Sequence, residues 1–141
     1  MKLDQQVCSL ELAKRFKELG VKQESLFYWE HYSINGWCIE WCELGPFSEH
    51  AVSAFTVAEL GEMLPDCIKY EYGYEAYIKS QKKDTEYKIY LDDLEKVAIF
   101  FDENEANARA KMLIYLLENG LIEDIKIFVL PNALKLVLGE K

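Results

Sequence analysis

The sequence of 141 residues contains no long hydrophobic run, and this lack argues against a membrane protein. No segment approaches the roughly 18–20 consecutive apolar residues of a membrane-spanning helix. The first residues, MKLDQQ, turn polar at once and lack the apolar centre of a signal peptide. We therefore expect a cytoplasmic protein with no membrane partner.

Positive charge is also scarce. The chain has 16 Lys and Arg residues against 25 Asp and Glu residues, which gives a net charge of −9. DNA or an anionic membrane surface repels such a chain taken as a whole. Lys14 and Arg15 belong to a short basic run, but glutamates flank them at helical spacing, as on a solvated helix face. The charge balance therefore disfavours nucleic-acid binding.

Metal ligands are few and badly spaced. Cys38 and Cys42 are the closest pair of cysteines, in a strand-like segment that would hold their side chains about 13 Å apart. Neither histidine completes a recognised zinc pattern. A chain that is not secreted keeps its thiols reduced. We predict free thiols and neither a metal nor another cofactor; the cysteines and histidines are Cys8, Cys38, Cys42, Cys67, His31 and His50.

No catalytic motif stands out either. A cysteine or serine nucleophile needs a nearby base, and no spacing links His31 or His50 to a cysteine. The glycines are scattered, so no phosphate-binding loop is present. Acidic pairs are plentiful but have structural explanations, such as the helix cap at Glu59. We predict no catalytic residues; a small enzyme whose site only the fold assembles remains an alternative.

The residues that are present predict one globular domain, 1–141. Half of them are hydrophobic and 29% are charged, which is enough apolar surface for a core without disulfides or metal. Ser9 can cap a helix over residues 10–19, which Gly20 ends. Thr56 and Glu59 form a capping box for a helix over 57–64, which Pro65 limits.

A third helix is predicted after Asp102, which would be its N-cap, with Glu105 at the third helical position. Gly120 would end this helix. Its apolar residues recur at helical spacing and predict one buried stripe, formed by Ala106, Ala110, Leu113 and Leu117. The state of the tail after Ile122 is left open.

Strands are predicted between these helices. Segments 26–32 and 37–42 flank Asn35-Gly36, which favours a hairpin with a type I′ turn, and residues 43–53 have the composition of a loop. In residues 68–79 the apolar side chains occupy the even-numbered positions and charged side chains the odd-numbered ones, which predicts a single strand. A turn at 81–84 and a strand at 85–91 are predicted to follow. The apolar run 97–101 suggests a more deeply buried strand. We predict an α+β fold: a mostly antiparallel sheet of about five strands, with the N-terminal and C-terminal helices packed on one face.

Three blocks resemble a known group of proteins: VCSLELAKRFKELGVKQESLFYWE (7–30), AFTVAELGEMLP (54–65) and EANARAKMLIYLLENGLI (105–122). They are similar to a family of small uncharacterised proteins of gut bacteria, often found in phage or mobile-element settings. The family has no assigned activity, so the resemblance implies a bacterial cytoplasmic origin and transfers no site residue.

Aromatic residues carry the functional expectation. Leu26 to Trp29 are consecutive apolar residues, whereas a strand in a sheet that is covered on one face needs an apolar residue only at every second position. Either the tail around residues 128–130 covers the second face or a partner does. We predict a non-catalytic protein-interaction module whose surface includes Phe27, Tyr28, Trp29, Trp37 and Trp41, with a second copy or another protein as partner. An acidic DNA mimic of phage origin is a further alternative.

The thiol prediction can be checked directly. Thiol titration of the denatured protein without reductant should find all four cysteines free, because the chain is expected in a reducing compartment. Elemental analysis should find no stoichiometric zinc. Fewer than four thiols, or about one zinc per chain, would contradict this prediction.

Overall fold

The computed structural model describes residues 2–69, 75–92 and 98–122. Its helical elements are a short 3₁₀ turn (Leu3–Gln5), α1 (Leu10–Glu18), α2 (Val57–Met63) and α3 (Glu105–Glu118). Its strands are β1 (Phe27–Tyr32), β2 (Gly36–Trp41), β3 (Val52–Ser53), β4 (Cys67–Lys69), β5 (Glu75–Lys83), β6 (Glu86–Asp92) and β7 (Ile99–Asp102).

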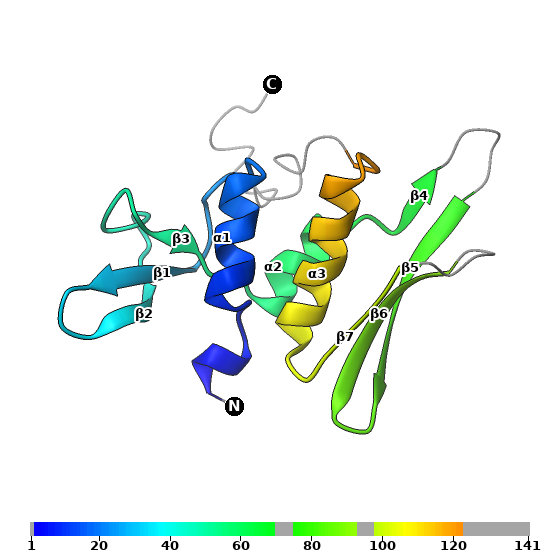
Figure 1. Ribbon diagram of the computed structural model, residues 1–141, viewed down its shortest axis with the longest axis horizontal. Helices are drawn as coiled ribbons and strands as arrows, with labels where there is room; N and C mark the ends of the chain where they lie inside the picture. Colours follow the sequence, from blue (N-terminus) through cyan, green and yellow to red (C-terminus); the bar gives the residue numbers. More distant parts are fainter. Residues whose placement is uncertain (1, 70–74, 93–97, 123–141) are drawn as a thin grey trace.

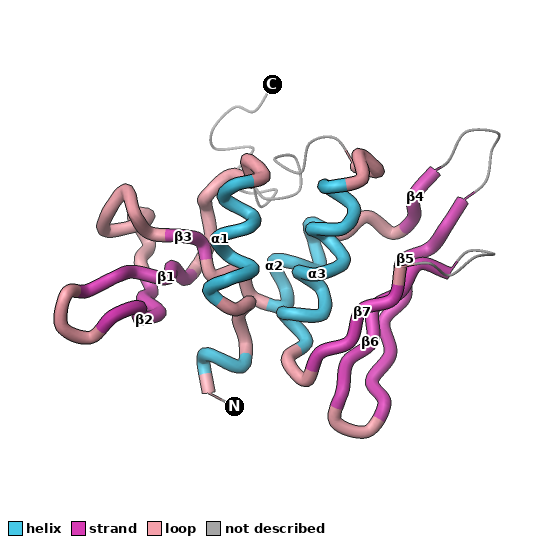
Figure 2. Tube along the Cα trace, in the orientation of Figure 1, coloured by secondary structure: helices cyan, strands magenta, loops and turns pink. Residues whose placement is uncertain are grey.

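The α+β class is confirmed, but the single sheet is wrong. The described strands form two antiparallel sheets, one ordered β2-β1-β3 and the other β4-β5-β6-β7. The three helices lie between these sheets (Figure 1; Figure 2). α1 contacts β3, and α3 contacts β6 and β7, so the first and last helices do not share one sheet face.

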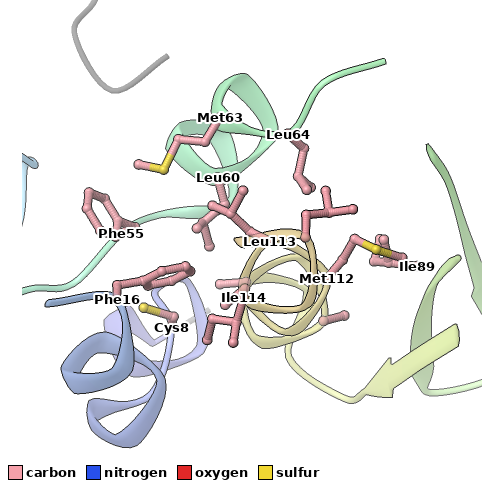
Figure 3. Close-up of a cluster of buried hydrophobic side chains, with 14 of the residues drawn as sticks. Cys8, Phe16, Phe55, Leu60, Met63, Leu64, Ile89, Met112, Leu113 and Ile114 are labelled. Carbon is pink, nitrogen blue, oxygen red and sulfur yellow. The ribbon is translucent and has the colours of Figure 1, made fainter. Parts of the chain in front are cut away.

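The core is centred on α3. More of this helix is buried than the single stripe that the sequence predicts. Ala106, Ala110 and Leu113 are buried as predicted, and Leu117 packs against the core while partly exposed. The helix contacts α1 and α2 as well as the four-stranded sheet. It therefore buries further residues, namely Ala108, Met112, Ile114 and Leu116. In Figure 3, Ile114 lies on the side of Phe16, whereas Met112 lies beside Ile89.

The two N-terminal helix predictions are confirmed. The Leu12 N–H donates to the Ser9 hydroxyl of α1 over 3.4 Å. Gly20 at the end of that helix has a φ of +84°, and the Val21 N–H donates to the Phe16 carbonyl, as in the expected C-terminal cap. At α2, Thr56 and Glu59 exchange the two hydrogen bonds of a capping box, of 2.9 and 3.2 Å.

The first hairpin exists, but its turn differs from the predicted one. Tyr32 pairs with Gly36, so three residues, 33–35, connect the strands. Gly36 has a φ of +72°, whereas Asn35 is not in the left-handed region. A type I′ turn needs positive φ at both central residues, and that prediction is therefore wrong. The expected loop at 43–53 also contains β3, which pairs with β1.

The predicted strand 68–79 is two strands instead. β4 and β5 pair antiparallel, with Cys67 opposite Tyr77 and Ile68 opposite Ala76. In this register odd-numbered residues pair with odd-numbered residues and even-numbered with even-numbered ones. The alternation of apolar and polar residues therefore continues unchanged from β4 into β5. Alternation alone therefore cannot distinguish one long strand from this hairpin. The middle of the predicted strand, 70–74, lies outside the described residues.

The remaining strands show two further corrections. The predicted turn at 81–84 begins too early, because β5 continues to Lys83 and the connection is Asp84-Thr85. The apolar run 97–101, of which residue 97 lies outside the described residues, does not form a deeply buried strand. Among the described strands β7 lies at one edge of its sheet, and Phe101 is 50% exposed. The reason is that α3 covers only the face that carries Ile89 and Leu91.

The N-cap of α3 is Asn104, not Asp102. The Asn104 side-chain oxygen accepts the N–H groups of Ala106 and Asn107, while its amide donates to the Val7 carbonyl over 3.1 Å. Asp102 accepts the Asn104 N–H over 2.8 Å and thus supports the cap from outside the helix. Glu105 is consequently the first helical residue.

Cap removal tests these helix starts. We expect Thr56→Ala and Asn104→Ala each to lower the free energy of unfolding by about 1 kcal/mol, because each leaves helix N–H groups without an acceptor. The measurement is chemical denaturation followed by circular dichroism. Glu103→Ala, at an exposed neighbouring position, is the control and should cost clearly less. Equal stability of Asn104→Ala and wild type would contradict the assigned cap.

Candidate functional site

The structure leaves only part of the predicted aromatic surface exposed. Tyr28 is only 2% exposed, and its hydroxyl donates to the Gln23 carbonyl. Phe27, Trp29 and Trp37 are half-buried. Trp41 is 56% exposed and is the one strongly exposed member of the predicted set.

Specific contacts hold two of these rings inside the molecule. The indole N–H of Trp29 donates to the Cys8 carbonyl over 3.1 Å. The ring of Trp37 lies 5.2 Å from that of His31, and the Lys14 ammonium lies 4.9 Å from its centre. These side chains therefore join the first sheet to the N-terminal segment and α1.

Other large apolar side chains in the same region are exposed. Leu26, just before β1, is 55% exposed; Leu44 and Phe47, in the loop after β2, are 98% and 64% exposed. Phe27 pairs with Trp41, so Leu26 and the end of β2 lie at the same end of the hairpin. We call Leu26, Trp41, Leu44 and Phe47 the hairpin patch. Sequence reasoning missed the two loop residues, although large apolar residues beside Gly45-Pro46 were an available signal.

A buried carboxylate anchors the loop that carries Leu44 and Phe47. Glu30 is 3% exposed, and its two oxygens accept the Phe47 N–H over 2.6 Å and the Ser48 hydroxyl over 2.9 Å. A buried carboxylate needs such partners because its desolvation is costly. The backbone of the loop is thus attached to β1, while the Phe47 ring faces solvent.

A cavity of about 610 Å³ lies beside the hairpin patch. Three segments form it: the residues leading into β1, the loop after β2, and α2. Its apolar lining comes from Leu26, Tyr28, Leu44 and Pro46. Its acidic lining comes from Glu24, Glu43, Glu59 and Glu62, and no Lys, Arg or His is among the described residues that line it.

Two of these glutamates have unusual surroundings. Burial raises the pKa of Glu59, although N–H groups of Thr56 and Leu26 donate to its carboxylate and oppose that shift. Glu24 pairs through one oxygen with the Lys22 ammonium over 3.1 Å. Its other oxygen is buried and accepts no hydrogen bond. One of the glutamates that line the cavity therefore has a carboxylate oxygen without a hydrogen-bond donor in the described structure.

The candidates for catalysis or metal binding are dispersed. His31 lies against Trp37, and His50 lies in a loop 3.7 Å from the exposed Glu49. Burial raises the pKa of the Cys8 thiol to about 12, so at neutral pH it is protonated and a poor nucleophile. Within the described ranges no three His, Cys, Asp or Glu residues are grouped to hold a metal ion. All four cysteines are free.

Comparisons with known proteins identified no relative of this chain. A scan of protein-family models, a search of curated proteins and a search of solved structures each gave no match. Within the part of the chain that the structure describes, no helix is long and apolar enough to cross a membrane.

The raised pKa of Glu59 predicts how stability depends on pH. A carboxyl whose folded pKa is raised contributes stability that is fully present below its unfolded pKa and is lost as pH rises through the folded value. Relative to Glu59→Gln, the free energy of unfolding of the wild type should therefore fall as pH rises through and above the ordinary titration range of a glutamate. Denaturation of both proteins across this range measures the difference, and a difference that rises with pH would contradict the assignment.

Proposed function

We propose that this protein is a non-catalytic interaction module of the cytoplasm, and that it docks another protein through the hairpin patch. The observation that carries the proposal is the exposure of four large apolar side chains, up to 98% for Leu44, in the residue before β1, at the end of β2 and in the loop after β2. Exposed apolar patches with a polar rim are typical of protein-binding surfaces. Burying one leucine side chain contributes roughly 1.5–3 kcal/mol, so a partner that covers the patch gains substantial free energy.

The patch is also held in place before a partner arrives. Cross-strand pairing positions Trp41 opposite Phe27, and Glu30 attaches the backbone of Phe47 to β1. A surface that is already ordered loses less conformational entropy on binding than a loop that must fold. This favours a docking role for Leu44 and Phe47 over a loop that is merely poorly packed.

Charge favours a different protein over a second copy. The net charge of the chain is −9, and the glutamate-lined cavity directly adjoins the patch. A symmetric dimer through the patch would bring the acidic groups of both copies together, and like charges facing each other across an interface cost binding energy. The proposed partner is therefore a protein of different sequence.

The double variant Leu44→Ser/Phe47→Ser tests this function. Phe101→Ser is the matched control, because Phe101 is a similarly exposed aromatic residue on the other sheet. A protein captured from the native cell would be identified, purified and titrated against all three forms. We expect the double variant to raise the Kd at least about tenfold and the control to change it by less than about twofold, because only the first removes apolar contacts from the interface.

Two results would contradict the proposal. Equal affinity of the wild type and the double variant would exclude the hairpin patch as the docking surface. Sedimentation of the protein alone at micromolar concentration covers the other case: a dimer that the double variant abolishes would mean that a second copy occupies the patch.

A further inference from the structure

We propose that the partner presents an arginine or lysine side chain between aliphatic residues, and that this cation enters the acidic cavity while the aliphatic residues cover the hairpin patch. The inference rests on the proposed function, because it specifies the chemistry of the segment that docks there.

The first argument is charge complementarity. Four glutamates line the cavity, and no cationic side chain is among the described residues that line it. The nearby Lys22 satisfies one oxygen of Glu24 and leaves the second oxygen buried without a donor. A guanidinium carries five N–H donors and no acceptor, so it can supply donors to several carboxylates at once. A neutral or acidic segment would bring no cation to the exposed carboxylates of Glu43 and Glu62.

The second argument is the apolar part of the lining. Leu26, Leu44, Tyr28 and Pro46 share the cavity with the glutamates. Arginine and lysine have a hydrocarbon stem that packs against apolar surface while the charged end reaches polar groups. The volume of about 610 Å³ falls in the roughly 300–1,000 Å³ range of ligand-binding pockets, which leaves room for a side chain and part of its backbone.

The third argument is continuity between the cavity and the patch. Leu26 and Leu44 belong to both, since each lines the cavity and is also strongly exposed. A peptide segment whose cation occupies the cavity therefore brings its neighbouring residues onto exposed apolar side chains. Alternation of aliphatic and cationic residues is the pattern that fits this arrangement.

The test uses two capped peptides, GLRLG and GLQLG, titrated into the ¹⁵N-labelled full-length protein. GLRLG should cause saturable shifts of the Ser25, Leu44 and Gly45 amide signals and should bind at least about tenfold more tightly than GLQLG. The double variant Glu24→Gln/Glu62→Gln should remove this preference, because it removes two charges while keeping similar side-chain volume. Glu103→Gln, an exposed glutamate outside the cavity, should leave it unchanged.

Melting curves of the variants confirm that they are folded before titration. Equal binding of both peptides, no saturable shift with GLRLG, or a preference that survives Glu24→Gln/Glu62→Gln would overturn the cation proposal. The docking function can survive that failure, because the Leu44→Ser/Phe47→Ser comparison with the natural partner is independent of it. Conversely, equal partner affinity of that double variant contradicts the docking function whatever the peptides do.

Discussion

The burial of α3 on two sides is the constraint on which the other elements depend. One side of the helix packs against α1 and α2, and the other covers β6 and β7, so a single helix holds both sheets in one core. Its approach to α2 is close: a Cβ at Gly61 would lie 2.7 Å from a guanidinium nitrogen of Arg109. Arg109 is in turn held by Glu105, one turn earlier in α3. Substitutions of the buried residues of α3 should affect the packing of both sheets and not one helix alone.

Local signals predicted the helices well because their causes are local. The capping hydrogen bonds at Ser9 and between Thr56 and Glu59 join residues three positions apart, so the residue pattern contains each of these interactions. The start of α3 was misassigned because Asn104 also binds Val7, and no local pattern reveals a contact between residues so distant in sequence. The β4–β5 hairpin was missed for a different reason, since its register preserves parity across both strands.

The candidate site was less predictable than the fold. Trp41 was identified from aromatic alternation, but burial of Tyr28 depends on the loop and strands that surround it. Glu59 was correctly recognised as a capping residue, yet its second role in the cavity requires the segment before β1 and the loop after β2 to meet α2. Glu24 and Glu43 lie 19 positions apart, and Glu43 and Glu59 lie 16 apart, so they cannot be grouped without knowing how the chain folds back. Of the glutamates that line the cavity, sequence patterns therefore assigned a role only to Glu59.

The attachment of the 43–50 loop to Glu30 has a kinetic consequence. Because the loop is already tied to β1 through the Phe47 N–H and the Ser48 hydroxyl, the partner that we propose would meet an interface that needs no prior folding step. The association rate is then set by diffusional encounter and by attraction between opposite charges, which ionic strength screens. The lifetime of the complex depends instead on how well short-range apolar contacts fit. In the proposed complex, charged groups thus control the association rate and apolar contacts control the lifetime. Substitutions in this region can therefore change one of these rates without changing the other.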